Sequence, residues 1–290
     1  MSSPFDLADN DAYLRWRERK LAQAIADADG LVVEITDPAA LTAAERSELL
    51  ARCRRSNMAI YATAAEMDER AVQRLGAQLG LLRLDANWLA GEQGVSRIAV
   101  HPGDGTRQAY IPYTDRAIKW HTDGYYNPPE RQIRGMILHC VRPAAQSGEN
   151  QLLDHEIAYL MLRDFDPELI RALSAPDAMT IPERTDEQGV ARAAQTGPVF
   201  SVDDAGHLHM RYTARTRSIE WKQDEATRAA VAQLERLLDS DLPHVFRTRL
   251  SPGMGLLCNN VLHDRAAFTD DPEQPRLLFR ARYLDRLSAN

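Results

Sequence analysis

The sequence contains few cysteines, no long apolar run and no excess of positive charge, and each absence excludes a class of protein. Its three cysteines, Cys53, Cys140 and Cys258, are widely spaced and form no CxxC pair. We therefore expect buried thiols, not disulfides or a zinc module. The longest apolar runs are far too short to span a bilayer. A net charge of −7 at pH 7 disfavours nucleic acids and membrane surfaces as partners.

The amino-terminal residues also lack features of a targeting signal. Residues 1–6 have neither a basic region nor an apolar core, so no secretory signal is expected. Unpaired thiols suit a reducing compartment. We therefore expect a cytoplasmic protein that binds a small molecule, with no nucleic-acid or membrane partner. Assembly into a homo-oligomer is left open.

The first 94 residues combine helix and strand patterns. These patterns alternate at residues 11–29, 31–35, 41–53, 58–61 and 66–79. Thr42 and Glu45 have the spacing of a capping box at the start of the second helix. This portion is therefore predicted to be mixed α/β.

From residue 95 the sequence pattern changes and predicts many short strands with a few helices between them. The predicted strands are 96–100, 135–141, 151–153, 179–181, 199–202, 208–212, 244–250, 255–259 and 276–284, and the predicted helices are 155–163, 167–173 and 224–238. This pattern is typical of an antiparallel barrel or sandwich with appended helices. We see no linker long enough to separate domains, so residues 1–290 are predicted to form one domain. Residues 103–115 and 185–195 are expected to be loops, and one of them is a candidate lid.

The most informative motif is Trp120-His121-Thr122-Asp123-Gly124. In an extended segment, residues two apart project to the same side, so His121 and Asp123 can reach one metal ion. His263, far along the chain, would complete a set of two histidines and one carboxylate. That set leaves positions open on an octahedral ion and is used by non-haem Fe(II) oxygenases. The same three ligands can also hold zinc in a hydrolase.

An arginine-rich segment follows His263. If residues 276–284 form a strand, Arg276, Arg280 and Arg282 lie on one face, where their charges require an anion. Arg282 is expected near the rim of the barrel. The alternative is an edge strand whose arginines form ordinary salt bridges.

These motifs, together with Gly135–Cys140 and Ser147–Gln151, resemble the taurine dioxygenase family of Fe(II)/2-oxoglutarate-dependent oxygenases. That superfamily also includes gamma-butyrobetaine hydroxylase. The resemblance implies an α+β fold with a double-stranded β-helix (jelly-roll) core in residues 95–285, flanked by helices and by the mixed α/β portion. It also implies an enzyme that uses Fe(II), 2-oxoglutarate and O₂ and releases succinate and CO₂.

The resemblance assigns roles to individual residues. It implies that His121, Asp123 and His263 are the iron ligands and that Arg276 binds the distal carboxylate of 2-oxoglutarate. Asn150 falls where relatives hydrogen-bond the cosubstrate. Arg280 falls where a second arginine lies near the cosubstrate or an anionic group of the substrate. The carboxylate Asp123 implies a hydroxylase or desaturase, because halogenating relatives have a small residue at that position.

The substrate is the least determined feature. Arg211, Arg215 and Arg217 would suit an acidic group, which favours a small anionic or zwitterionic metabolite, but they could equally form a solvated basic stretch. Tyr125 is a further candidate contact. With Tyr110, Tyr113 and Tyr126 it could line a cage for a quaternary ammonium, or these rings could simply pack in the core. A non-catalytic relative that binds a small acid is the other alternative.

Overall fold

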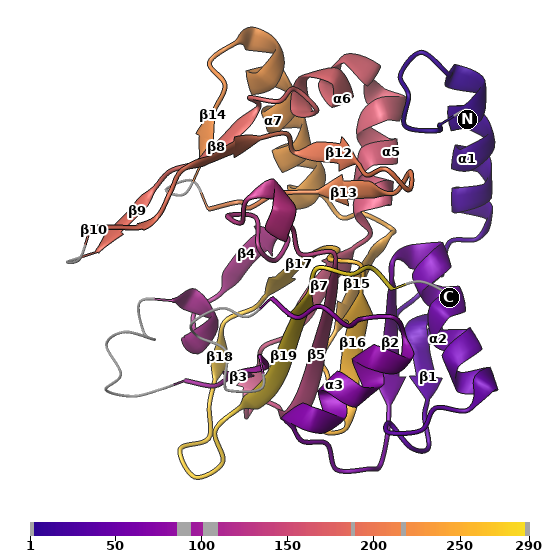
Figure 1. Cartoon of the computed structure of the whole chain (residues 1–290), viewed down its shortest axis with the longest axis vertical. Helices are drawn as coiled ribbons and strands as arrows, with labels where there is room; N and C mark the ends of the chain where they lie inside the picture. Colours follow the sequence, from indigo (N-terminus) through magenta and orange to yellow (C-terminus); the bar gives the residue numbers. More distant parts are fainter. Residues whose placement is uncertain (1–2, 86–93, 101–109, 187–188, 216–218, 288–290) are drawn as a thin grey trace. The chain divides into compact units, whose positions relative to one another are not determined.

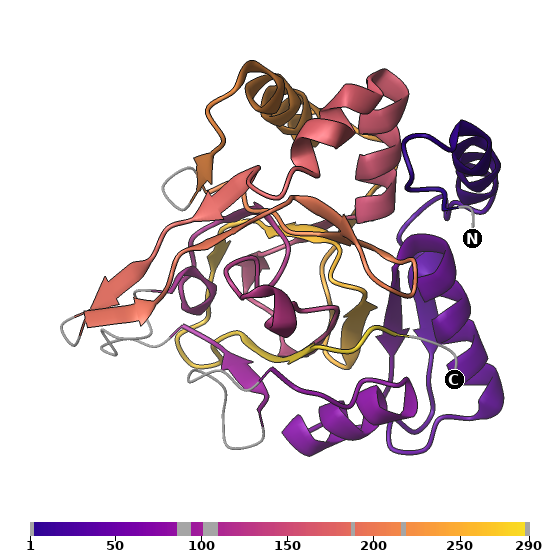
Figure 2. The same ribbon diagram turned by 45° about the horizontal axis from the view of Figure 1, so that its top comes forward.

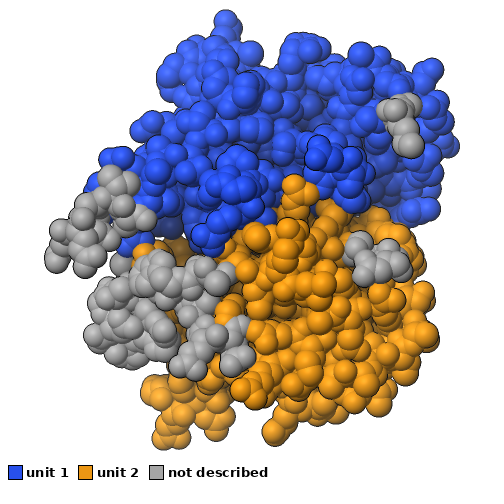
Figure 3. Space-filling view, viewed as in Figure 1, with its two compact units in different colours: residues 1–24, 119–132, 153–245 blue, residues 25–118, 133–152, 246–290 orange. Residues whose placement is uncertain are grey.

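The computed structural model describes residues 3–85, 94–100, 110–186, 189–215 and 219–287. The chain forms two compact units, each made of segments that are distant in sequence. Unit 1 comprises residues 1–24, 119–132 and 153–245, and unit 2 comprises residues 25–118, 133–152 and 246–290 (Figure 3).

Unit 2 is built on a six-stranded sheet of order β1-β2-β16-β5-β19-β3 (Figure 1). Its strands are β1 (Val32–Glu34), β2 (Met58–Ala62), β3 (Ser96–Ile98), β5 (Gly135–Arg142), β16 (Met254–Cys258) and β19 (Leu277–Tyr283). β1 and β2 are parallel, whereas β16 pairs antiparallel with both β2 and β5, and β19 pairs antiparallel with both β5 and β3. The predicted α/β portion therefore contributes strands to the main sheet.

Helices α2 (Ala43–Ser56) and α3 (Glu69–Gln78) cover one face of this sheet (Figures 1 and 2). Thr42 and Glu45 form the predicted capping box at the start of α2. Leu49 and Leu75 from the helices join Phe279, Ala281 and Tyr283 of β19 in one buried apolar cluster. Alternation along β19 thus directs its odd-numbered residues toward the helices.

The opposite face of the sheet packs on a second layer of strands. β7 (Asn150–Leu153) lies between β15 (Val245–Thr248) and β17 (Leu262–Arg265). Leu152 of β7 and Phe246 of β15 share an apolar cluster with Leu278 of β19. The short strands β6 (Gln146–Ser147) and β18 (Phe268–Thr269) pair beside it. Even-numbered residues of β19, including the arginines, therefore point to this interior side.

Unit 1 contains four α-helices and several small antiparallel sheets among its described residues. The helices are α1 (Asn10–Ala22), α5 (His155–Phe165), α6 (Pro167–Leu173) and α7 (Glu225–Asp239). The strands are β4 (Ile118–His121), β8 (Met179–Ile181), β9 (Arg184–Asp186), β10 (Gly189–Arg192), β11 (Gln195–Gly197), β12 (Phe200–Val202), β13 (Leu208–Met210) and β14 (Glu220–Trp221). β8 is the centre of a three-stranded sheet with β11 and β14.

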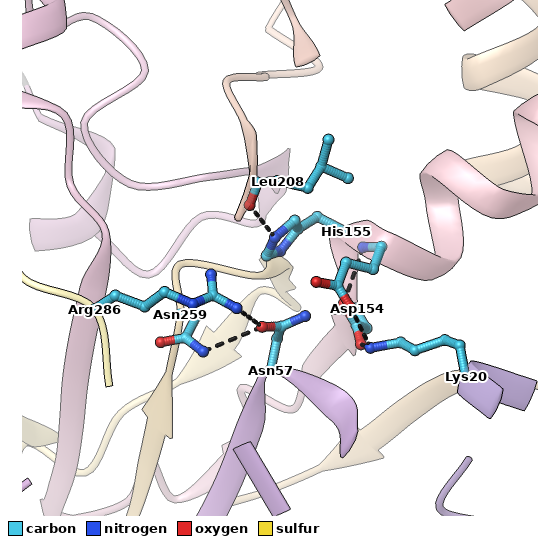
Figure 4. Close-up of polar contacts among 8 residues, drawn as sticks. Lys20, Asn57, Asp154, His155, Leu208, Asn259 and Arg286 are labelled. Carbon is cyan, nitrogen blue, oxygen red and sulfur yellow. Dashed lines mark hydrogen bonds and ion pairs between the residues drawn. The ribbon is translucent and has the colours of Figure 1, made fainter. Parts of the chain in front are cut away.

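Buried polar networks fasten the chain within each unit (Figure 4). In unit 1, Lys20 of α1 pairs with Asp154 at 2.6 Å and with Glu156 at 2.5 Å, which ties α1 to the start of α5. In unit 2, the side-chain oxygen of Asn57 accepts hydrogen bonds from Asn259 and Arg286. Asn57 ends α2 with a φ of 55°, so this network holds a left-handed residue in place.

Most of the predicted elements are confirmed, but the short strands β6, β11, β14 and β18 were not predicted, and two predicted segments differ from the structure. The first helix ends at Ala22, seven residues before the predicted end, because the apolar residues that follow join the 3₁₀ turn Asp29–Leu31 and the core of unit 2. The predicted loop 185–195 contains the antiparallel strands β9 and β10. Within the described ranges, none of the helices has the length and apolarity that a bilayer crossing requires. The prediction of one domain stays a prediction.

Candidate metal and anion site

His121 ends strand β4, and Asp123 lies in the turn that follows it. The segment 212–214 holds this region: Thr122 N donates to the Tyr212 carbonyl at 3.0 Å, and Ala214 N donates to the Trp120 carbonyl at 2.8 Å. Gly124 permits the turn with a φ of 68°. The predicted extended geometry therefore applies to His121, while Asp123 reaches its position through a turn.

The His121 ring is oriented by its own strand. Its Nδ1 lies 2.9 Å from the carbonyl oxygen of Lys119. A carbonyl can only accept, so Nδ1 carries the proton and Nε2 presents a lone pair. That Nε2 lies 3.9 Å from Oδ1 of the buried Asp123. An imidazole nitrogen and a carboxylate oxygen at this separation can bind the same ion.

His263 shows the same arrangement on β17. Its Nδ1 lies 2.9 Å from the carbonyl oxygen of Val261, two residues earlier, and its side chain is buried. With Nδ1 as the donor of this hydrogen bond, Nε2 carries the lone pair that a metal ion could bind. Among the described residues, His121, Asp123 and His263 each offer one ligand atom within 4.8 Å of the others, so the three could hold one metal ion.

Asn150 contacts the strand that carries His263. Its side-chain nitrogen donates to the main-chain carbonyl of Asp264 at 2.5 Å. The Asp264 carboxylate in turn accepts from the main-chain N of Gln151 at 2.7 Å. Asn150 thus stabilises the backbone beside His263. The predicted hydrogen bond from Asn150 to the cosubstrate stays a prediction.

Arg276 is a buried cation without a carboxylate partner in the described part of the chain. Its side chain is 5% exposed, and its guanidinium carbon lies 5.0 Å from the centre of the Phe268 ring. Burial lowers the pKa of Arg276 to about 10, so the guanidinium remains charged at neutral pH. A desolvated, unpaired charge is costly. A carboxylate ligand would suit this environment, and the predicted contact between Arg276 and 2-oxoglutarate stays a prediction.

The two arginines within β19 differ from each other. Arg282 is buried and pairs with Asp85 at 2.6 Å, so the expected position at the rim is wrong. The sequence around Asp85 carries no signal for this partnership. Arg280 lies on the same face as Arg276 by the alternation of the strand and is partly exposed. Its predicted contact with cosubstrate or substrate stays a prediction.

Arg211 has a structural environment that the sequence did not indicate. The buried guanidinium donates to four main-chain carbonyls, those of Met179, Gln195, Gly197 and Pro198. It thereby joins β8 to β11. These contacts favour a structural role over the predicted substrate contact, because the donors of the fork are already used.

Arg215 and Tyr125 lie near the predicted ligands His121 and Asp123 in unit 1. Arg215 is exposed and follows Thr213, which pairs with His121 across an isolated bridge. Burial raises the pKa of the Tyr125 hydroxyl, and the nearby Arg215 guanidinium opposes that shift. Both residues therefore remain candidates for substrate binding. Arg217 lies outside the described residues.

The tyrosines do not share one environment. Tyr113 is buried in the apolar cluster of unit 2, which is ordinary packing. Tyr125 and Tyr126 pack edge to face, with ring centres 5.2 Å apart, and Arg192 lies over Tyr126. A guanidinium over one of these rings occupies a surface that a cationic ligand would need. Residues 103–109 of the candidate lid lie outside the described residues.

Residues 17–282 match the model of the taurine catabolism dioxygenase TauD, TfdA family. The chain is also 33% identical over 193 residues to a uridine-5'-phosphate dioxygenase from Amycolatopsis sp., covering 64% of each chain. A uridine-5'-phosphate dioxygenase from Streptomyces sp. is 34% identical over 178 residues, 58% of this chain and 62% of that protein. The matches thus span less than two thirds of the length of these relatives.

Solved structures show a similar fold at low sequence identity. An asparagine oxygenase in complex with Fe(II), 3-hydroxyasparagine and succinate superposes with a TM-score of 0.61 at 17% identity, covering 97% of this chain and 85% of that one. The non-haem iron oxygenase OrfP in complex with Fe and alpha-ketoglutaric acid gives 0.60 at 16% identity, covering 87% and 93%. These likenesses concern the fold.

Proposed function

The chain belongs to the taurine catabolism dioxygenase TauD, TfdA family, and on that premise we propose that it oxidises a small phosphorylated metabolite with Fe(II), 2-oxoglutarate and O₂. Family membership and the dioxygenase names of the relatives support a non-haem iron oxygenase that acts on a small substrate. A jelly-roll core formed by the two facing strand layers of unit 2 is part of the proposal and is supported by the fold of the structural neighbours.

The proposal assigns the iron to His121, Asp123 and His263. It is carried by one observation: one ligand atom from each of these residues lies within 4.8 Å of the others. Two neutral imidazoles and one carboxylate suit Fe(II) and leave positions for other ligands. The carbonyls of Lys119 and Val261 hold both imidazoles in the tautomer that binds a metal through Nε2.

Arg276 is assigned to the distal carboxylate of 2-oxoglutarate. A guanidinium offers a bidentate fork to a carboxylate and keeps its charge when buried. When bound, Fe(II) and 2-oxoglutarate supply the chemistry that reduces O₂, with succinate and CO₂ as the by-products. A zinc hydrolase would need the same three ligands, but it would supply no cosubstrate carboxylate to pair with the buried charge of Arg276.

A nucleoside 5'-phosphate is the substrate class that the relatives favour. Both are named for uridine 5'-phosphate and match more than half of this chain. A phosphate needs a cation outside the metal site, and Arg215 beside Tyr125 is an exposed arginine close to His121 in the fold. Arg280 is the second candidate for an acidic group of the substrate.

Two measurements test this function. Fe(II) and 2-oxoglutarate are added without oxygen, and a weak visible charge-transfer band is expected. Succinate formation is then measured with uridine 5'-phosphate, uridine and taurine. We expect succinate above the substrate-free background with the phosphate ester and not with uridine. If the band forms but uridine 5'-phosphate gives no more succinate than uridine, the proposed phosphorylated substrate is wrong. If no band forms, the proposed cosubstrate is wrong.

A further inference from the structure

Arg265, two residues after His263, is a buried arginine whose hydrogen bonds all go to the main chain of one segment. Its side chain is 4% exposed. The guanidinium donates to the carbonyls of Pro112, Thr114 and Arg116, at 2.7 Å in the case of Thr114. Like Arg276, it has no carboxylate partner within ion-pair distance among the described residues. The chain therefore maintains a second buried positive charge at the end of β17.

Arg265 and Arg276 lie against the same aromatic ring. Their guanidinium carbons are 4.8 and 5.0 Å from the centre of Phe268. The two carbons therefore cannot be farther apart than the sum of these distances, about 10 Å. Phe268 is itself fixed, because its N donates to the Asp115 carbonyl at 3.0 Å and it pairs with Ser147 in β6.

Two like charges at this distance repel each other in a desolvated environment. The ring face offers each cation partial compensation, and the Asp115 and Asp270 carboxylates act on Arg265 and Arg276, respectively, without forming an ion pair with them. A bound anion would offset both charges at once. Because the terminal nitrogens of Arg265 already donate to three carbonyls, Arg265 would act on that anion chiefly through its field and through the placement of Phe268, while Arg276 makes the contact.

We propose that Arg265 is a positioning residue for cosubstrate binding, and that Arg265, Phe268 and Arg276 form a two-cation site for the distal carboxylate of a 2-oxo dicarboxylic acid. This inference rests on the proposed function and deepens it. It explains why a charge that touches no carboxylate is buried beside the ligand strand.

The test compares charge with hydrogen bonding at residue 265. The dissociation constant of 2-oxoglutarate is measured without oxygen from the charge-transfer band of the Fe(II) protein. Arg265→Gln removes the charge and should raise that constant about tenfold, which corresponds to about 1.4 kcal/mol. Arg265→Lys keeps the charge and should restore most of the affinity, although it cannot donate to three carbonyls at once. Phe268→Leu should give an intermediate increase.

The control is Arg163→Gln. Arg163 is also buried, donates to the carbonyls of Pro4 and Asp6, and lies over the ring of Tyr13, but it belongs to α5 in unit 1. This variant should lower thermal stability and leave the 2-oxoglutarate dissociation constant unchanged.

A purely structural role would make Gln and Lys at residue 265 equally harmful to stability, with unaltered affinity, and would overturn the inference. If Arg265→Gln does not fold, unchanged affinity in Phe268→Leu would overturn it as well. Failure of the proposed function is distinguishable, because the unmodified protein would then show no band at all.

Discussion

The side-chain nitrogen of Asn150 donates a 2.5 Å hydrogen bond to the main-chain carbonyl of Asp264, the residue that directly follows His263. The carboxylate of Asp264 is also held, by the main-chain N and the side chain of Gln151. β7 therefore fixes β17 by side-chain contacts at the point where the proposed ligand projects. The position of His263 depends on these contacts as well as on its own strand.

Asn150→Ala should weaken Fe(II) binding more than 2-oxoglutarate binding. The change leaves a buried carbonyl without its donor, so the free energy of unfolding should fall by about 1–3 kcal/mol. Iron titration and denaturant unfolding measure the two effects. Gln78→Ala, which removes an amide that donates to the Pro38 carbonyl, is the control and should leave iron affinity unaltered. If the variant shows a raised Michaelis constant for 2-oxoglutarate and normal iron affinity, the result would instead favour a direct contact between Asn150 and the cosubstrate.

Arg276→Ala should raise the Michaelis constant for 2-oxoglutarate by about tenfold or more, because a desolvated charge pair is worth at least about 2 kcal/mol. Arg276→Lys should rescue this only partly, because an ammonium is a point charge without the bidentate fork. Steady-state succinate formation at saturating Fe(II) gives the Michaelis constant for 2-oxoglutarate in both variants. An unchanged Michaelis constant in Arg276→Ala would contradict this role and would make Arg280 the candidate for binding the distal carboxylate.

Arg211 and Arg215 should behave in opposite ways. Arg211→Ala leaves four carbonyls without donors and should lower the free energy of unfolding by at least about 3 kcal/mol, while the Michaelis constant for substrate changes little at temperatures where the variant is folded. Arg215→Ala should raise that constant with little loss of stability, because Arg215 is exposed. The reverse pattern would restore the substrate role of Arg211 and exclude Arg215.

His139 should make the protein less stable in acid. Burial lowers the pKa of His139 from 6.5 to about 4, and the ring shares a 2.9 Å hydrogen bond with the Tyr61 hydroxyl. Below pH 6.5 the unfolded chain binds a proton that the folded chain does not. The stabilisation is therefore present above pH 6.5 and is lost as the pH falls toward 4, by at most about 3 kcal/mol.

Denaturant unfolding of the natural protein and of His139→Gln at several pH values between 7 and 4 checks this prediction. The variant should show a shallower dependence on pH. Equal slopes in the natural protein and in His139→Gln would show that His139 does not titrate as described.

Local signals predicted much of the fold. Thr42 and Glu45 marked the start of α2, and the alternation of residues 277–283 gave the two faces of β19 correctly. The pairing of β9 with β10 was missed because polar residues dominate that hairpin, and the length of α1 was overestimated because apolar spacing continues into a 3₁₀ turn.

The environments of the arginines were predicted less well than the fold, because they depend on partners that are distant in sequence. Nothing near Arg282 indicates Asp85, and nothing near Arg211 indicates the four carbonyls that surround it. The sequence indicated His121, Asp123 and His263 because these residue types suit Fe(II) and because their order resembles that of the family. It indicated Arg276 through the same resemblance, and these roles stay predictions.

The proposed iron site can be tested by anaerobic titration of Fe(II) and 2-oxoglutarate into the natural protein and into His263→Ala. We expect a visible charge-transfer band in the natural protein that saturates at one iron per chain, and its loss in His263→Ala, Asp123→Ala and His121→Ala, with each variant still folded. A band of normal amplitude in any of these three variants, or none in the natural protein, would contradict it.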